Sequence, residues 1–207
     1  MDYSKLVENL IKREYLKTPL IIDAFKTINR ADFVPEDMKD EAGFDSPLPI
    51  GHGQTNSQPY TVAFMLELLQ PQPGEKILDV GSGSGWTSAL MAYCVGQNGK
   101  VFAAERIPVL CEFGKNNIAK YNFIAKGIVR MIYADGAKGL AKEAPFDKIL
   151  VSASAQEMPE SLRGQLEING RMVVPIQNSI WLVVRRSENK FEEKEFPGFV
   201  FVPLIED

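Results

Sequence analysis

The feature of this 207-residue chain best suited to binding a ligand is a run of glycines at alternate positions within Asp79–Trp86 (DVGSGSGW). The run follows a short β-rich stretch and precedes a helical one, so it predicts a strand-to-helix turn. Glycine lets the main chain turn tightly and lets a ligand lie against bare backbone. The following helix would offer unpaired N–H groups and a partial positive charge. The motif therefore predicts a ligand site.

Acidic residues lie at the ends of the next two strands that the sequence predicts after this turn. Glu105 ends the second strand, 24 residues after Gly81, where a carboxylate can accept two ribose hydroxyls. Asp135 and Gly136 follow the third strand. A dinucleotide fingerprint would need a third glycine where Trp86 stands. With Asp79 before the glycines, the motif instead resembles the first motif of S-adenosylmethionine-dependent methyltransferases. That class usually contacts adenine near the end of the third strand.

Hydrolase chemistry has no support. The G-x-S-x-G pattern of a nucleophile elbow would place its serine where Gly83 stands. The one histidine, His52, lies beside two glycines, and we interpret it as a solvated loop residue. Cys94 and Cys111 have no metal-ligand spacing, and we expect two packed thiols and no metal.

Composition indicates an ordinary globular protein, with 45% hydrophobic and 24% charged residues. We expect one domain over residues 1–207, with N-terminal helices and a substrate-covering loop in 1–60 and a cofactor-binding core in 61–207. The net charge of −4 disfavours a nucleic-acid partner. No apolar run reaches the roughly 20 residues that span a bilayer, and the N-terminus shows no apolar signal region, so we expect a cytoplasmic monomer.

Periodicity predicts a doubly wound, Rossmann-like α/β sheet with an N-terminal helical cap. Two helices are expected in the first 30 residues, a long loop over Phe33–Gly53, and a helix over Tyr60–Leu69. The expected strands are Lys76–Val80, Lys100–Glu105, Ile128–Tyr133, Lys148–Ser152 and Arg171–Pro175. The expected intervening helices are Trp86–Val95, Pro108–Tyr121, Lys138–Glu143 and Pro159–Glu167. These βαβ units imply a mostly parallel sheet.

The C-terminal tail has a different pattern. Ile180–Arg186 and Phe199–Leu204 predict two sequential strands that form an antiparallel hairpin. The charged run Glu188–Glu195 between them is interpreted as a solvated turn.

Beyond the cofactor motif, the chain resembles the protein-L-isoaspartate O-methyltransferase family along nearly its whole length. The segment Leu48–Tyr60 (LPIGHGQTNSQPY) is similar to the signature that this family carries before the glycine motif. Further matches, in order, are Arg30–Pro35, Asp79–Trp86, Asp135-Gly136 with Gly139, Ala144–Asp147, Pro159–Leu162 with Gln165-Leu166, and Phe201–Leu204. Ordered matches over the whole chain are more specific than any one motif.

The resemblance implies methyl transfer from S-adenosylmethionine to the free α-carboxylate of L-isoaspartyl residues in damaged proteins and peptides. The methyl ester then collapses to a succinimide without the enzyme. Ser57 matches the family's active-site serine. The implied substrate-binding positions are Thr55, Ser57, Pro59, Tyr60 and Val202, the last through its backbone. The implied cofactor-binding positions are Asp79, Gly81, Ser82, Gly83, Gly85, Glu105, Arg106, Asp135 and Gly136.

Two departures from the family pattern fall in the predicted substrate loop. Asn56 replaces the usual Ile, and Tyr60 stands where some members have His. They motivate an alternative hypothesis, a methyltransferase of the same fold with another peptide carboxylate or a small molecule as acceptor. A third hypothesis, a scaffold without catalysis, is disfavoured by the intact glycines and by Glu105 and Asp135.

The scarcity of acid–base residues suits carboxyl methylation. A free carboxylate with a pKa near about 4 is already ionised at neutral pH, so no general base is required. The protein must align the two reactants and exclude water, and positioning can supply on the order of 7–11 kcal/mol. We expect Ser57 to orient the carboxylate by hydrogen bonding, and the loop from Ser46 to Tyr60 to close over the site.

Overall fold

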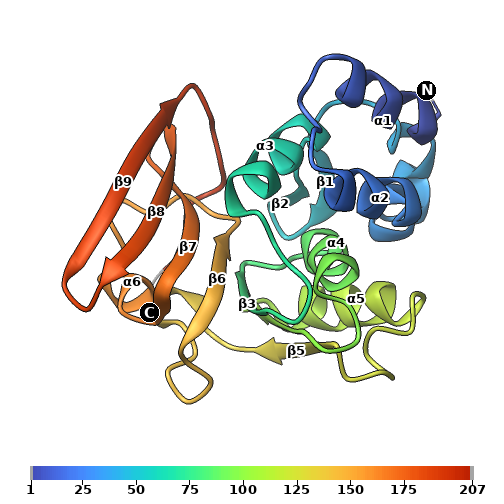
Figure 1. Ribbon diagram of the computed structural model, residues 1–207. Coiled ribbons are helices and arrows are strands. Elements are labelled where there is room, and N and C mark those ends of the chain that lie inside the picture. The colour runs from blue at the N-terminus through green and yellow to red at the C-terminus, as the bar shows by residue number, and fades with distance from the viewer. Residues whose placement is uncertain (1, 206–207) are drawn as a thin grey trace.

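A seven-stranded sheet in the order β5-β4-β3-β6-β7-β8-β9 forms the centre of the computed structural model, which describes residues 2–205 (Figure 1). The strands are β3 (Lys76–Val80), β4 (Lys100–Glu105), β5 (Val129–Tyr133), β6 (Phe146–Val151), β7 (Leu166–Ile176), β8 (Ser179–Ser187) and β9 (Lys190–Pro197). The first five are parallel, β8 pairs antiparallel with β7, and β9 pairs antiparallel with β8. The predicted Rossmann-like sheet with antiparallel C-terminal strands is confirmed.

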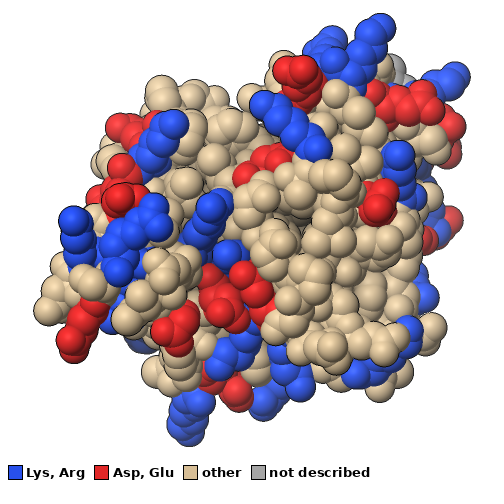
Figure 2. Space-filling view, viewed as in Figure 1, with Lys and Arg blue, Asp and Glu red and all other residues tan. Residues whose placement is uncertain are grey.

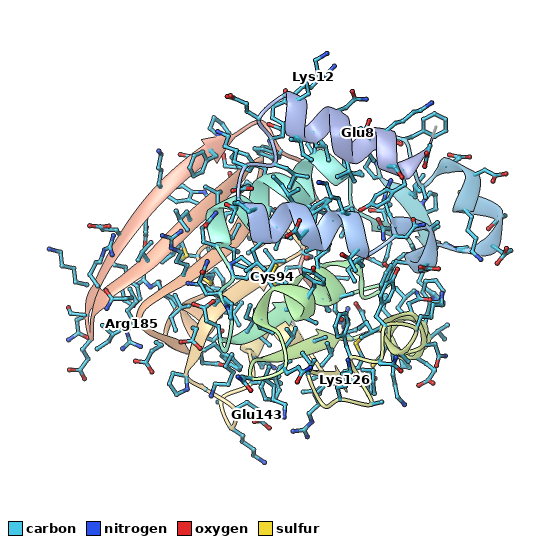
Figure 3. All side chains as sticks on the ribbon, turned by 45° about the vertical axis from the view of Figure 1, so that its right-hand side comes forward. Glu8, Lys12, Cys94, Lys126, Glu143 and Arg185 are labelled. Atoms are coloured by element: carbon cyan, nitrogen blue, oxygen red, sulfur yellow. The ribbon has the colours of Figure 1, made fainter. Side chains whose placement is uncertain are left out.

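Helices cover one face of this sheet in two layers. The inner layer is α3 (Pro59–Leu69), α4 (Trp86–Val95) and α5 (Pro108–Ala119), and the outer helices are α1 (Tyr3–Lys12) and α2 (Pro19–Thr27). Figure 1 shows α1 and α2, in blue, above α4, which fits the predicted helical cap. On α1, Glu8 and Lys12 point to solvent, whereas Cys94 lies in the interior beneath α2 (Figure 3).

The central strands are buried on both sides, as strands in a parallel sheet usually are. Side chains alternate between the faces along each strand, so Ile77 joins the core under the helices and Leu78 joins the core on the opposite face. Both side chains are fully buried.

Short elements cover the second face, where the sequence predicted two longer helices. Instead of Lys138–Glu143 the chain forms the 3₁₀ turn η3 (Gly136–Lys138), which stops at Gly139 with a positive φ of 70°. Instead of Pro159–Glu167 it forms the single helical turn α6 (Glu160–Arg163). Leu166 already pairs with Phe146 in the sheet, so this helix cannot extend further.

The predicted C-terminal hairpin exists, but its second strand was placed wrongly. Glu188 and Asn189, at the start of the charged run interpreted as a turn, do form the turn, but residues 190–195 lie in β9, which pairs antiparallel with β8. Charged side chains are tolerated there because β9 is an edge strand and largely exposed. Phe199–Leu204 lies outside the sheet and runs past the end of β6, where Pro203 forms an isolated bridge with Ser154.

The region between α2 and α3 is more ordered than the predicted loop. It contains the 3₁₀ turns η1 (Arg30–Phe33) and η2 (Glu36–Glu41) and an antiparallel pair, β1 (Leu48–Gly51) with β2 (Gln54–Asn56). His52 is exposed in the turn between β1 and β2, with a positive φ of 54°. Its position fits the interpretation as a solvated loop residue.

The start of α2 is held by a carboxylate from α3. Glu67 accepts hydrogen bonds from the backbone N–H groups of Lys17 and Thr18 at 2.8 and 2.9 Å and from the Thr18 hydroxyl at 2.7 Å. The Thr18 side chain makes no capping bond of its own to α2. Glu67 therefore fixes the helical cap to the core.

We expect Glu67→Ala to lower the free energy of unfolding by about 1–3 kcal/mol, because bonds to a charged group contribute about that much and two N–H groups lose their acceptor. Urea denaturation followed by circular dichroism measures the change. The matched control is Glu8→Ala on the exposed side of α1, which should stay within about 0.5 kcal/mol of wild type. Equal effects from the two variants would contradict this role for Glu67.

Candidate active site

A cleft lies at the carboxyl ends of the parallel strands, where the strand order reverses between β3 and β6. Its empty volume is about 860 Å³, including space open to solvent. Four of the segments that line it lie at the ends of sheet strands, residues 81–84, 105–107, 135–136 and 152–153, and two come from the predicted substrate loop and the C-terminal segment, residues 54–57 and 202–205. The chain thus brings together both classes of residue that the sequence predicted.

The glycine turn, residues 81–85, connects β3 to α4. Gly81, Gly83 and Gly85 have φ values of 74°, 51° and 85°, a region that L side chains rarely adopt. The N–H groups of Gly81 and Ser82 both donate to the Ala104 carbonyl, at 2.9 and 3.1 Å, which ties the turn to β4. Gly81, Ser82 and Gly83 line the cleft.

Gly85 has a packing role that its motif position did not reveal. A Cβ built on Gly85 would lie 2.8 Å from the Ile118 side chain of α5, so only glycine fits between the two helices. Gly85 is not among the residues that line the cleft. Trp86 follows it, is buried, and packs edge-on against Phe25 of α2, with ring centroids 5.7 Å apart.

Glu105 joins two neighbouring strand ends. One carboxylate oxygen accepts the Gly83 N–H at 2.8 Å, and the other accepts the Ile107 N–H at 2.9 Å. The residue is 5% exposed and lines the cleft. Each oxygen has a second lone pair, so the carboxylate can still accept hydroxyl groups from a ligand.

Asp79 lies inside the protein, one layer behind the cleft surface. One of its oxygens accepts the hydroxyls of Thr87 and Ser88 on α4, at 2.9 and 2.5 Å. Burial raises the pKa of Asp79 to about 6, although these two hydrogen bonds favour the charged form. Asp79 is not among the lining residues, but Thr87 is. The Asp79 carboxylate is thus separated from the cleft by the Thr87 side chain, whose hydroxyl it accepts.

At the end of β5, Asp135 and Gly136 both line the cleft. The Asp135 side chain accepts the Ala137 N–H at 3.0 Å and so caps η3. A Cβ on Gly136 would lie 2.7 Å from the Val80 side chain, so glycine is required for close approach to β3. Arg106 lines the cleft on the β4 side.

The substrate loop, residues 46–57, forms the opposite wall. Thr55 and Ser57 line the cleft, whereas Pro59 and Tyr60 are not among the lining residues. Pro59 begins α3, and the Tyr60 ring lies 4.5 Å from the Tyr15 ring and 6.2 Å from the Phe199 ring. The structure therefore places Tyr60 in an aromatic cluster beside the loop.

Val202 lies at the cleft with the rest of the C-terminal segment. Its carbonyl accepts the Ser154 N–H at 2.8 Å, and the Ser154 carbonyl accepts the Leu204 N–H at 2.8 Å. These bonds hold the segment beside the end of β6. Among the backbone groups of Val202, the carbonyl is thus already paired within the protein.

The substrate loop is fastened to the body of the protein by Arg30, whose guanidinium is fully buried. It donates to backbone carbonyls along the loop and its approach, those of Ala42, Phe44, Ser46, Asn56 and Ser57, at 2.7–3.3 Å. It also lies over the Trp86 ring, 5.4 Å from the centroid. Burial lowers the pKa of Arg30 to about 10, so the group stays protonated at neutral pH.

Sequence patterns had not assigned several residues to the site. Arg30 was part of a matched motif with no role attached, and Asn56 was a departure from the family pattern. Asn56 lines the cleft and Arg30 lies behind it. Further lining residues that had no assigned role include Ile50, Gln54, Ser84, Ile107, Ser152, Ala153 and Pro203. Ile107 could have been found from its place directly after the strand-ending Glu105-Arg106. The loop residues come from distant segments and carry no local signal.

Two features are absent from residues 2–205. No group of three or more His, Cys, Asp or Glu side chains in this range is arranged to hold a metal ion. No helix among these residues has the length and apolar character needed to cross a bilayer.

Known proteins match the chain along its whole length. The curated protein-L-isoaspartate O-methyltransferase of Methanopyrus kandleri is 43% identical over 205 residues, covering 97% of this chain and 90% of the relative. Protein-L-isoaspartate O-methyltransferase 2 of Archaeoglobus fulgidus is 41% identical, covering 99% of this chain and 94% of the relative.

A solved structure agrees over the complete fold. A Plasmodium falciparum protein assigned as a protein-L-isoaspartate O-methyltransferase, crystallised with S-adenosyl-L-homocysteine, superposes with a TM-score of 0.90 at 26% identity, over 100% of both chains. The family model for protein-L-isoaspartate(D-aspartate) O-methyltransferase matches residues 1–207. On these grounds the chain belongs to the protein-L-isoaspartate(D-aspartate) O-methyltransferase family.

Proposed function

We infer that this chain transfers a methyl group from S-adenosyl-L-methionine to the free α-carboxylate of L-isoaspartyl residues in damaged proteins and peptides. The ester product collapses to a succinimide, which starts the repair. The observation that carries this function is one cleft shared by a glycine turn with acidic strand ends and by the loop bearing Ser57, in a chain whose whole length matches the family.

The residues present fit S-adenosylmethionine. Gly83 has a positive φ of 51°, and a Cβ on it would lie 3.3 Å from Ile50, so glycine suits the bare backbone where the turn meets the substrate loop. Glu105 retains lone pairs for hydroxyl groups, and Asp135 lies at the next strand end. Ile107 and Ala104 add an apolar wall suited to a flat base. When bound, the cofactor supplies a methyl group on a positively charged sulfur.

The chain's own task in this reaction is to position groups. The acceptor carboxylate is already ionised at neutral pH, so the chain's residues need to remove no proton and have only to hold this carboxylate where it would meet the methyl group. We propose that Ser57 donates a hydrogen bond that orients this carboxylate, since none of the described residues bonds its hydroxyl. Thr55 and Val202 are proposed to hold the peptide on either side.

The two departures that motivated another acceptor do not favour it. Tyr60 lies outside the cleft lining, within an aromatic cluster. The Asn56 side chain lines the cleft but is committed to hydrogen bonds with Arg30 and Ser84. Neither residue presents a new recognition group to a substrate. We therefore keep the isoaspartyl carboxylate as the acceptor.

We further propose that residues 1–60 and 61–207 act as one unit, and that the chain works as a cytoplasmic monomer without nucleic acid. Cys94 and Cys111 are free thiols, which suits a reducing compartment. The edge strand β9 carries charges that disfavour edge-to-edge pairing. On the face shown in Figure 2, basic and acidic side chains are intermixed, which supports the absence of a polyanion partner.

The decisive test offers labelled S-adenosylmethionine with two peptides that differ only in isoaspartate or normal aspartate at one position. We expect methyl incorporation into the isoaspartyl peptide alone. A buffer lacking peptide measures background labelling. Equal labelling of the two peptides, or labelling of neither, would exclude the proposed function.

Ser57→Ala and Glu105→Gln should separate the two halves of the cleft. Loss of one hydrogen bond to the charged acceptor should lower kcat/KM for Ser57→Ala about 10–100-fold, with affinity for S-adenosylhomocysteine nearly unchanged. Glu105→Gln should weaken that affinity at least about tenfold, because an amide N–H₂ would face a backbone N–H. Calorimetry and steady-state kinetics measure both effects, and the reverse pattern would show that the roles are misassigned.

Asp79 should make cofactor binding depend on pH. In the free protein its pKa is about 6, so below this pH the carboxyl is protonated. Bound S-adenosylmethionine would bring positive charge into the cleft beside Thr87 and favour the ionised form of Asp79, so binding should release a proton and weaken as pH falls through 6, by up to about tenfold per unit. We expect Asp79→Asn to flatten this dependence in calorimetry between pH 5 and 7.5.

The matched control for this pH experiment is His52→Asn, which removes the chain's only histidine. We expect that variant to keep the wild-type dependence. A flat profile in His52→Asn, with an unchanged profile in Asp79→Asn, would show that the pH dependence does not come from Asp79.

A further inference from the structure

The buried guanidinium of Arg30 cannot serve as the substrate's carboxylate site. Its donors are already used by five backbone carbonyls and by the Asn56 side chain, whose Oδ1 accepts from Nε at 2.8 Å. Arginine has only five N–H groups, so at least one of them is already shared. Arg30 therefore acts on the site through the backbone that it holds, including the Ser57 carbonyl at 3.1 Å.

The contact with Arg30 fixes the orientation of the Asn56 amide. Because Arg30 Nε can only donate, Asn56 must turn its oxygen toward it and its N–H₂ group away. That N–H₂ group donates to Ser84 Oγ at 3.0 Å and approaches the Phe33 carbonyl at 3.4 Å. Asn56 is only 3% exposed, so water cannot readily replace these partners.

Ser84 carries the chain of bonds into the glycine turn. It lies between Gly83 and Gly85, is 3% exposed, and lines the cleft. Its carbonyl accepts the Asn117 side chain of α5 at 3.2 Å, so its backbone is held from the other side. Because its oxygen accepts from Asn56, its own proton is directed to another acceptor.

We propose that the hydrogen bonds joining Arg30, Asn56 and Ser84, which we call the positioning relay, couple the position of the substrate loop to the conformation of the glycine turn. Arg30 fixes the loop's carbonyls. The Asn56 amide bonds to Arg30 through its oxygen and to Ser84 through its nitrogen, and Ser84 is part of the turn, so a shift of the loop would also shift the turn. A ligand that orders the turn thereby orders Ser57. The relay rests on the proposed function. Its three residues are positioning residues, which act through the groups that they hold and not by contact with the reacting atoms.

The first test is hydrogen exchange by mass spectrometry, with S-adenosylhomocysteine as the probe. In wild type, the probe should slow amide exchange about tenfold in residues 46–57 as well as in 81–85. In Ser84→Ala and Asn56→Leu, protection of 81–85 should persist, and protection of 46–57 should fall to less than about twofold. Unchanged protection of the loop in both variants would overturn the relay.

Ser179→Ala is the matched control. Ser179 is also a buried serine, on β8, and its hydroxyl donates to Glu195 at 2.6 Å, away from the cleft. It should retain the wild-type protection of both segments. Loss of loop protection in this control would mean that general destabilisation, and not the relay, accounts for the result.

The second test is a double-mutant cycle in turnover of the isoaspartyl peptide, at a temperature where circular dichroism shows every variant folded. Each single variant should lower kcat about tenfold with the KM for S-adenosylmethionine within about threefold, and the double variant should fall no further. Independent effects, with the double variant about a hundredfold down, would overturn the coupling. If wild type fails to methylate the peptide, the proposed function fails, while the exchange experiment still decides the relay.

Discussion

The parallel pairing of β3 with β4 on one side and β6 on the other is the constraint on which the site depends. Parallel strands end at the same edge, so this pairing collects the glycine turn, Glu105 and residues 152–153 around one crevice. The bond from Gly83 N–H to Glu105 then fixes the turn to the neighbouring strand end. Without that register, the conformation of the glycines alone would not form a site.

Each buried charged group around the cleft is compensated by a different kind of partner. Glu105 binds backbone N–H groups, Asp79 binds hydroxyls of α4, and Arg30 binds carbonyls of the substrate loop. Removing a charge from water is costly, and hydrogen bonds only offset that cost. Apolar residues could fill the same volume, so stability alone does not explain these groups. Glu105 and Arg30 hold backbone beside the cleft, and Asp79 holds two side chains of α4, so positioning is the property that they share.

Much of this structure could be predicted from the sequence, and the exceptions have physical causes. The parallel core follows from apolar runs such as Lys76–Val80, and the ligand turn follows from its glycines. β9 was missed because an edge strand tolerates the same charges as a solvated turn. Arg30 was not assigned because its partners are mainly carbonyls, which every residue carries. Asn56 was not assigned for a similar reason, since its side-chain partners Arg30 and Ser84 are distant in sequence.

Methyl transfer to an ionised carboxylate places unusual demands on a protein, because the reaction needs geometry and no proton transfer. The only histidine can therefore lie in an exposed turn, while the cleft has main-chain atoms on both walls. Main-chain atoms can be aligned only by groups that hold the backbone. Arg30 and Glu105 do this from opposite sides, one on the substrate loop and one on the glycine turn. Asn56 connects the two systems through Ser84, so the two walls of the cleft are positioned relative to each other and not merely within themselves.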